Sequence, residues 1–217
     1  MNNPFAHHTD KTAATANSSS KSTQLALDAM MGIGVFAALL VVCYLLFVTP
    51  NQVDGSSMFP NLENDEVLLT NRIIQNFGGT GSLVSSYDYQ RGDIVVFHDE
   101  ILDRDLVKRV IGLEGDSVRI EGGRVYVNNL LMIEDYIDLA NYPTETDTFM
   151  EEGETVIVPE NSYFLLGDNR PGSKDSRNAT IGFVTREELR GAPFLRVFPL
   201  DKFSYIGRGE WELIQSN

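Results

Sequence analysis

The sequence predicts a mostly β protein, in which an antiparallel, barrel-like β domain follows one N-terminal transmembrane helix. Two observations lead to this fold class. Residues 29–48 are twenty consecutive uncharged and mainly apolar residues, and the chain beyond them consists of short runs rich in β-branched and aromatic residues, separated by Gly, Asn, Asp and Pro. We expect a disordered tail at 1–24, a transmembrane anchor at 25–49 and the β domain at 50–217.

The apolar run has the length of a membrane-spanning helix. At ~1.5 Å per residue, twenty helical residues cover the ~30 Å hydrocarbon core of a bilayer. A buried core helix of this kind would need more surrounding protein than the remaining chain supplies. A cleaved signal peptide has a shorter apolar region that ends in small residues, whereas this one ends in "LFVTPNQ". We therefore predict an uncleaved anchor.

The charge distribution predicts the orientation of the anchor and excludes some partners. Lys11 and Lys21 precede the apolar run, and no Lys or Arg follows it until Arg72, so the tail is expected in the cytoplasm and the β domain outside. The chain carries a net charge of −14, which argues against a nucleic-acid partner. With one Cys and three His, a disulfide framework and a Cys/His metal site are not expected, and no cofactor is predicted.

Six segments of the β domain have strand character, and turn residues separate them. Gly122-Gly123 divides two alternating runs and predicts a hairpin. Thr185 with Glu188 in "TREELRG" predicts a short capped helical turn, and the Gly/Ser-rich stretch at 76–87 predicts a loop. The expected strand segments are "EVLLTNRII", "DIVVFH", "LVKRVIGL", "SVRIEGGRVYVNN", "ETVIVP" and "YFLLGD".

Adjacent serines in "VDGSSMFPNL", Ser56 and Ser57, raise the question of a nucleophile, which needs a base. His98 ends a predicted strand and is followed by Asp99 and Glu100, so a Ser/His/acid triad can be drawn. The alternative is a solvated histidine at a strand end. Nothing else near His98 in the sequence decides between the two.

A lysine offers a second route to a base. In "DLVKRVIGL" the strand period places Leu106, Lys108 and Val110 on one face and Arg109 on the other. If the Lys108 face is buried, desolvation lowers its pKa from ~10.4 and produces a neutral amine that can act as a general base. Arg109 is then expected to remain solvated. Since strands also carry lysines for solubility, this segment alone leaves both interpretations open.

Four segments together resemble the type I signal peptidase family in order and character. They are "VDGSSMFPNL", "RGDIVVF", "KRVIGLEGD" and "GDNRPGSKDSRNATIGFV", spanning Val53 to Val184. The resemblance implies a β domain outside the membrane, behind an N-terminal anchor, that cleaves secretory signal peptides with a serine–lysine dyad. The single anchor is similar to the Gram-positive branch of the family.

The same resemblance implies roles for individual residues. Ser57, directly before the methionine, corresponds to the nucleophile, and Lys108 to its general base. In "GSKDSR", Ser173 is expected to hydrogen-bond and orient the lysine amine. Asp175 and Arg177 are expected to form an ion pair that fixes this loop beside the site.

The resemblance also implies the substrate. Exported preproteins with small residues at positions −1 and −3 before the cut would bind as an extended strand. Apolar residues beside the dyad, namely Val53, Met58 and Val107, are expected to line the small pockets. The lipid bilayer is the second expected partner, because tethering to it raises the effective concentration at the cut.

Some positions depart from the family pattern. Gly55 stands where some members carry a serine whose side chain donates to the oxyanion, so the Ser57 amide is the expected donor here. None of the other departures removes a catalytic group. They are Asn61 for the usual Thr, Glu114 for the frequent Pro, and Pro171-Gly172 before Ser173, where the altered loop makes that serine's role depend most on the structure.

Two other classes of protein share parts of this pattern. A self-cleaving repressor also uses a Ser/Lys dyad on a β fold, but it needs a DNA-binding half, and this chain has an apolar helix in that place. A membrane-anchored β domain with a binding role only is the second alternative, and intact Ser57 and Lys108 argue against it.

Overall fold

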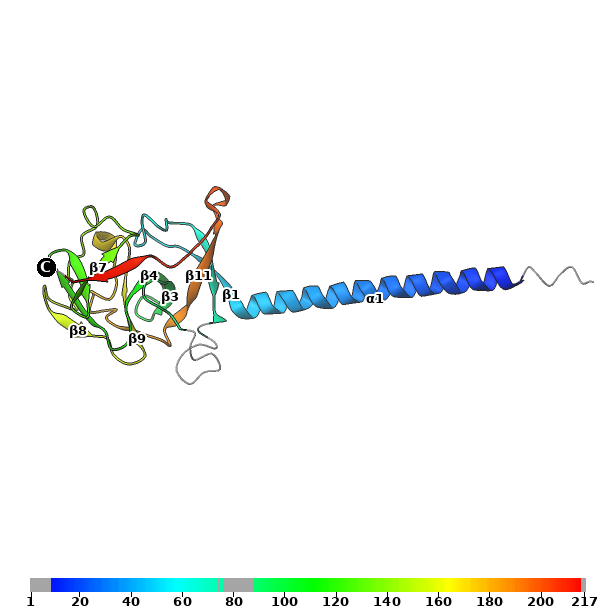
Figure 1. The fold of residues 1–217 in the computed structure, drawn as a ribbon, viewed down its shortest axis with the longest axis horizontal. Coiled ribbons are helices and arrows are strands. Elements are labelled where there is room, and N and C mark those ends of the chain that lie inside the picture. Colours follow the sequence, from blue (N-terminus) through cyan, green and yellow to red (C-terminus); the bar gives the residue numbers. More distant parts are fainter. Residues whose placement is uncertain (1–8, 74, 76–87, 216–217) are drawn as a thin grey trace, which may run out of the picture. The chain divides into compact units, whose positions relative to one another are not determined.

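The computed structural model describes residues 9–73, 75 and 88–215. By its internal contacts the chain divides into two compact units, Met1–Leu46 and Phe47–Asn217. The division falls close to the boundary predicted between residues 49 and 50. The first unit is helical and the second is a β domain (Figure 1).

Helix α1 (Thr9–Phe47) is longer than the predicted anchor at its N-terminal end. The prediction of a disordered tail at 1–24 is wrong for 9–24, which are helical, and residues 1–8 lie outside the described part. The sequence from Thr9 to Met31 contains no Gly or Pro. Extending a helix that already exists costs little per residue, because the unfavourable nucleation step has been made. The polar stretch therefore continues the helix.

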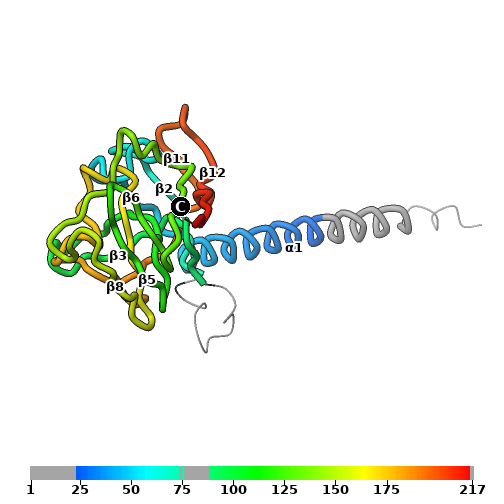
Figure 2. The backbone as a smooth tube through the Cα atoms, turned by 60° about the vertical axis from the view of Figure 1, so that its left-hand side comes forward, coloured from blue at the N-terminus to red at the C-terminus, as the bar shows by residue number. Residues whose placement is uncertain are grey.

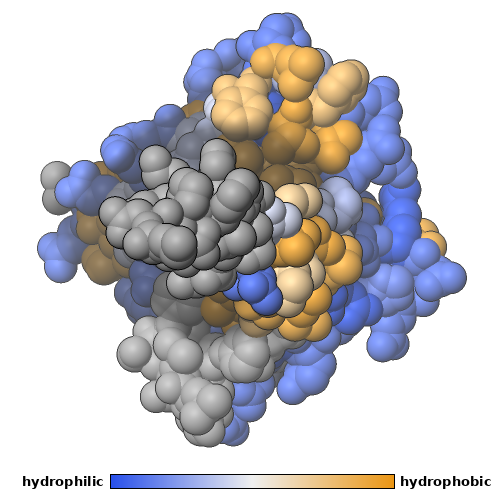
Figure 3. Space-filling view, turned by 90° about the vertical axis from the view of Figure 1, so that its right-hand side faces the viewer, coloured by the Kyte–Doolittle hydropathy of each residue, from blue (hydrophilic) through white to orange (hydrophobic). Residues whose placement is uncertain are grey.

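The C-terminal end of α1 comes two residues before the predicted end of the anchor. Val48 and Thr49 belong to strand β1 (Val48–Gln52). Pro50 explains the change, because a proline disfavours the helical conformation in the residue before it and cannot donate to a helical hydrogen bond. Thr23–Phe47 is long and apolar enough to cross a membrane, and its side chains are mainly exposed. Exposed apolar residues appear in orange on the face shown in Figure 3.

The described strands of the β domain form two antiparallel sheets, as the sequence predicts (Figures 1 and 2). The first has the order β1-β2-β11-β3-β4-β9-β10, with β12 paired to β11, and the second the order β13-β7-β6-β5-β8. Besides β1, the first sheet contains β2 (Val67–Asn71), β3 (Ile94–Asp99), β4 (Arg104–Gly112), β9 (Ser162–Leu166), β10 (Val184–Thr185), β11 (Leu189–Phe198) and β12 (Ser204–Tyr205). The second contains β5 (Ser117–Glu121), β6 (Arg124–Val127), β7 (Leu130–Glu134), β8 (Thr155–Ile157) and β13 (Trp211–Ile214).

Strand β4 lies at the centre of the first sheet, between β3 and β9. Its register pairs Lys108 with Val95 of β3 and Arg109 with Leu166 of β9. Residues 106–112 are buried without alternation, because apolar clusters cover both faces of the strand. A charged side chain in this strand therefore enters a packed interior whichever face it occupies.

The predicted strands are found where the sequence places them, and the Gly122-Gly123 hairpin joins β5 to β6 with Glu121 opposite Arg124. Strand β11, which was not predicted, pairs with both β2 and β3. It contains Gly191 and Pro193, residues that argue against a strand, and its pairing with β2 shifts register just after Pro193. The predicted loop at 76–87 lies outside the described residues.

The short capped turn predicted at Thr185 is present at 186–188, but it does not continue into a helix. Glu188 Oε2 accepts hydrogen bonds from the Thr185 amide and hydroxyl at 2.6 and 2.7 Å, which is the contact expected of a helix cap. The chain nevertheless turns directly into β11, where Leu189 pairs with Phe97 of β3. Sheet pairing of Leu189 therefore prevents the turn from extending into a helix.

Gly112, at the end of β4, allows a close contact between the two sheets. A Cβ built there would lie 2.8 Å from Val118 Cγ2 and 2.9 Å from Val158 Cγ2.

We expect Gly112→Ala to lower the free energy of unfolding by about 1–3 kcal/mol, as overpacking of a core does. Chemical denaturation measures it. Gly207→Ala is the control, since the nearest atom to its Cβ would be 3.7 Å away, and equal stability of the two variants would contradict the prediction.

Candidate active site

The twin serines lie in a turn between β1 and β2. The Phe59 amide donates to the Ser56 carbonyl at 3.1 Å and the Leu62 amide to the Met58 carbonyl at 2.9 Å. The turn begins after Gly55, whose φ of +93° suits glycine. Ser56 is exposed to solvent, whereas Ser57 is half-buried. The two hydroxyls therefore have different environments, although they are adjacent in sequence.

Lys108 reaches Ser57 across 51 residues of sequence. Its Nζ lies 2.7 Å from Ser57 Oγ and donates to the Val107 carbonyl at 2.9 Å. The side chain is 2% exposed, and this burial lowers the pKa of Lys108 from 10.5 to about 8, although the Asp175 and Asp168 carboxylates oppose the shift. The structure thus brings together the two residues predicted as a dyad, with the lysine in the desolvated environment that the sequence left open.

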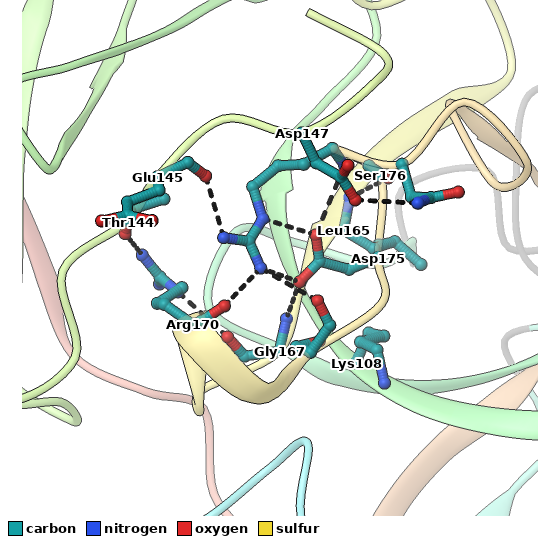
Figure 4. Close-up of polar contacts among 12 residues, drawn as sticks. Lys108, Thr144, Glu145, Asp147, Leu165, Gly167, Arg170, Asp175 and Ser176 are labelled. Atoms are coloured by element: carbon teal, nitrogen blue, oxygen red, sulfur yellow. Dashed lines mark hydrogen bonds and ion pairs between the residues drawn. The ribbon is translucent and has the colours of Figure 1, made fainter. Parts of the chain in front are cut away.

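Asp175 and Arg177 form the predicted ion pair, which is buried and bidentate. Arg177 Nε donates to Asp175 Oδ1 at 2.7 Å, and its Nη2 to Oδ2 at 2.8 Å. The same guanidinium donates to the carbonyls of Arg170 and Glu145, at 2.7 and 2.9 Å. Asp175 also accepts from the Gly167 amide at 3.0 Å, so the pair ties the end of β9 to the following loop (Figure 4).

Ser173 does not make the hydrogen bond expected of it. Its Oγ is buried and has no hydrogen-bond partner among the described residues, and Lys108 Nζ is bonded to Ser57 and Val107 instead. Ser173 packs against the end of β9, where a Cβ on Gly167 would lie 2.2 Å from Ser173 Oγ and 2.5 Å from the Ser57 carbonyl oxygen. Only a glycine at 167 leaves room for both serines.

Asn169, which the sequence reasoning missed, holds the serine turn from the other side. Its amide donates to the Ser57 carbonyl and its Nδ2 to the Ser56 carbonyl, both at 3.0 Å. A Cβ on Gly172 would lie 2.6 Å from this Nδ2, so the glycine that departs from the family pattern makes room for Asn169. Asn169 belongs to the quoted "GDNRPGSKDSR" segment, which was the available signal.

Arg109 is buried, contrary to the prediction that it stays solvated. It is 2% exposed, and its Nε and Nη2 donate to the two carboxylate oxygens of Asp168 at 2.8 and 2.6 Å. These bonds raise the pKa of Arg109 against the effect of burial. The prediction failed because it assumed one solvent-exposed face of β4, whereas both faces are covered.

The three predicted pocket residues lie together beside the Ser57–Lys108 pair. Val53, Met58 and Val107 belong to one apolar cluster and are 4, 1 and 8% exposed. They pack as part of the core in this structure. A substrate contact with them stays a prediction.

His98 is not placed to serve Ser57. Its Nδ1 lies 3.1 Å from Asp105 Oδ1, and its pairing with Asp105 puts it three residues along β3 from Val95, the partner of Lys108, or ~10 Å. The predicted acid partners Asp99 and Glu100 make no bond to it among the described residues. Among all the residues that the structure describes, no three or more His, Cys, Asp or Glu side chains are grouped so that they could hold a metal ion.

Comparison with known proteins gives consistent matches. The family model described as signal peptidase, peptidase S26, matches residues 26–198. The chain is 34% identical to signal peptidase I U of Bacillus subtilis, over 82% of this chain and 91% of the relative. It is 32% identical to signal peptidase IB of Staphylococcus aureus, over 82% of this chain and 93% of the relative.

Among solved structures, a signal peptidase I from Enterococcus faecalis is 33% identical with a TM-score of 0.41, and the match covers 49% of this chain and 97% of that one. The family assignment depends on the sequence matches, which extend over most of the chain. They include both the serine turn and strand β4. The protein therefore belongs to the signal peptidase family, peptidase S26.

Proposed function

We propose that this protein is a membrane-bound serine endopeptidase that removes signal peptides from exported preproteins, with Ser57 as nucleophile and Lys108 as general base. The observation that carries the proposal is the 2.7 Å contact between Ser57 Oγ and the Nζ of a lysine that is almost fully buried. A structural lysine would be expected to keep its charge through a carboxylate partner. Lys108 Nζ instead contacts a hydroxyl and a backbone carbonyl.

The geometry supports an acyl-enzyme mechanism. In its neutral form Lys108 accepts the proton of Ser57 Oγ as this oxygen attacks the scissile carbonyl. The resulting ammonium donates that proton to the leaving amine, and the C–N bond breaks to give an ester on Ser57. A water molecule, deprotonated by Lys108, then attacks the ester carbonyl. The acyl C–O bond breaks, and Ser57 Oγ takes the proton back from Lys108 as the acid product leaves. One buried amine thus serves both half-reactions.

The Ser57 amide is the proposed oxyanion donor. It has no hydrogen-bond acceptor among the described residues, while Asn169 holds the carbonyls of Ser56 and Ser57 and thereby the orientation of the peptide group between them. A donor of this type contributes ~2.7–4 kcal/mol to transition-state binding. A Cβ on Gly55 would meet no atom within 4 Å, which leaves open space beside the turn for an extended substrate strand.

The bilayer is the proposed second partner, with residues 1–24 on the cytoplasmic side and the β domain of 50–217 outside. The apolar part of α1 supports a single span. Within the β domain, the hairpin of β11 and β12 also exposes Phe198, Leu200, Phe203 and Tyr205, at 52 to 79%. An exposed apolar group of this size is typical of a lipid or protein contact. Preproteins with small residues at −1 and −3 remain the proposed substrates.

The dyad predicts a defined mutational pattern. Ser57→Ala and Lys108→Ala should each lower the cleavage rate of a preprotein in detergent by at least about 10³-fold, because each removes a group that acts in the chemical step. Ser56→Ala and His98→Ala are the controls and should keep most activity. Full activity in Lys108→Ala would contradict the dyad, and loss of activity in folded His98→Ala would favour the triad. No cleavage by the wild type would favour the binding-only alternative.

The pKa of Lys108 predicts the pH profile. Because only the neutral amine is a base, kcat/KM should rise with pH up to a plateau above about 8. Asp175→Asn removes the carboxylate that most strongly opposes this low pKa, so the rise should move to lower pH. Rate profiles of the two proteins measure the shift. Asp138→Asn, an exposed carboxylate, is the control, and a shift of Asp175→Asn to higher pH would contradict the prediction.

The proposed orientation is testable in whole cells. A protease added to spheroplasts should cleave the β domain and leave a tag at the N-terminus intact, because the positive residues of the tail keep it inside. Immunoblotting with two tags, one at each end, measures this. Loss of the N-terminal tag with retention of the C-terminal one would reverse the orientation.

A further inference from the structure

Asn61 ends the turn that carries Ser57, and its side chain makes two hydrogen bonds. Asn61 Nδ2 donates to the Tyr136 carbonyl and to Asp168 Oδ2, both at 2.8 Å. The amide nitrogen has two hydrogens, and each has its own acceptor. This fixes the direction of the side chain and saturates its donors.

Both acceptors belong to a rigid framework. Asp168 is fully buried and holds Arg109 in two bonds, at 2.8 and 2.6 Å. The Tyr136 ring lies 3.9 Å from the same guanidinium, and its hydroxyl donates to Glu134, which is 4% exposed. Because Arg109 directly follows Lys108 in β4, Asn61 is bonded to the framework that also holds the lysine strand.

Packing alone does not hold Asn61 in place. Together with Leu62, Arg109 and Tyr136, it borders a cavity of about 400 Å³, so the turn has open space on that side. Its own carbonyl accepts one further bond from Arg196 Nη2 at 2.8 Å. Leu62, the next residue, is 1% exposed and packs in the core, and the directional bonds of Asn61 add the restraint on the open side of the turn.

We propose that Asn61 is a positioning residue, whose two donated hydrogen bonds hold the Ser57 turn at the distance from Lys108 that proton transfer requires. The inference rests on the Ser57–Lys108 mechanism proposed above. A threonine at this position, as in the family pattern, has a single hydroxyl hydrogen and can donate only one bond. The asparagine thus provides a second restraint that threonine cannot supply.

An isosteric pair of variants tests the inference. Asn61→Thr retains one donor and Asn61→Val none, while their side chains have the same shape. We expect kcat to fall in the order wild type, Asn61→Thr, Asn61→Val, with a loss of about tenfold or more for the valine and KM changed by less than about twofold. Cleavage of a peptide substrate in detergent gives kcat and KM, and thermal unfolding of each variant gives its stability. Asn178→Leu is the control, because it removes an amide–carboxylate bond of the same length, to Asp147 at 2.8 Å, together with two bonds that its Oδ1 accepts from Thr180, without touching the serine turn.

Each outcome decides a separate point. If Ser57→Ala is inactive and folded Asn61→Val has the kcat of the wild type, the positioning role is wrong and the dyad stands. A rise in KM at unchanged kcat would overturn it in favour of a substrate contact. If Asn61→Val does not fold, the kcat of Asn61→Thr is compared with that of the wild type. Equal kcat values for these two proteins would overturn the inference. Activity in Ser57→Ala would instead overturn the proposed function.

Discussion

The burial of the Lys108 amine is the constraint on which the rest of the site depends. A fall in its pKa from 10.5 to about 8 corresponds to about 3 kcal/mol of destabilisation of the folded state below pH 8, where the ammonium must be buried. Between these two values the unfolded chain binds more protons than the folded one, so the penalty disappears as pH rises. The protein maintains an unfavourable environment for the ammonium, and the apolar clusters that cover both faces of β4 sustain it.

The two carboxylates that raise the pKa of Lys108, Asp175 and Asp168, are themselves held in buried ion pairs. Asp175 and Asp168 each favour the ammonium, but each is also bonded through two oxygens to an arginine, Arg177 or Arg109. Desolvation nevertheless remains the largest effect on the pKa of Lys108, and the Arg104 and Arg177 charges act in the same direction. Removing one partner of such a pair leaves an uncompensated buried charge, which is strongly destabilising. The pairs therefore connect stability to the pKa of Lys108.

Much of the fold could be predicted because strand patterns are local in the sequence. The Ser57–Lys108 pair could be predicted because several motifs occur in a characteristic order. Hydrophobic patterning located most central strands, and the four segments pointed to Ser57 and Lys108. Tertiary effects account for the errors. Arg109 is buried because a second layer covers its face, Thr185 makes its capping contact without a helix, and β11 contains the residues that usually exclude a strand. None of these follows from a window of a few residues, because each depends on a partner far away in the sequence.

The serine turn has no regular secondary structure, so side chains and glycines must supply the precision that a strand gives Lys108. Asn169 fixes the carbonyls at its start, and Gly167 lets the end of β9 approach within contact of Ser57. Asn61 fixes its end through Asp168. Gly167, Asn169 and Asp168, the partner of Asn61, all lie in the loop that directly follows β9. Arg177 holds this loop through a hydrogen bond to the Arg170 carbonyl. A serine on a turn and a lysine on a strand need such a third element, because neither residue can fix the position of the other.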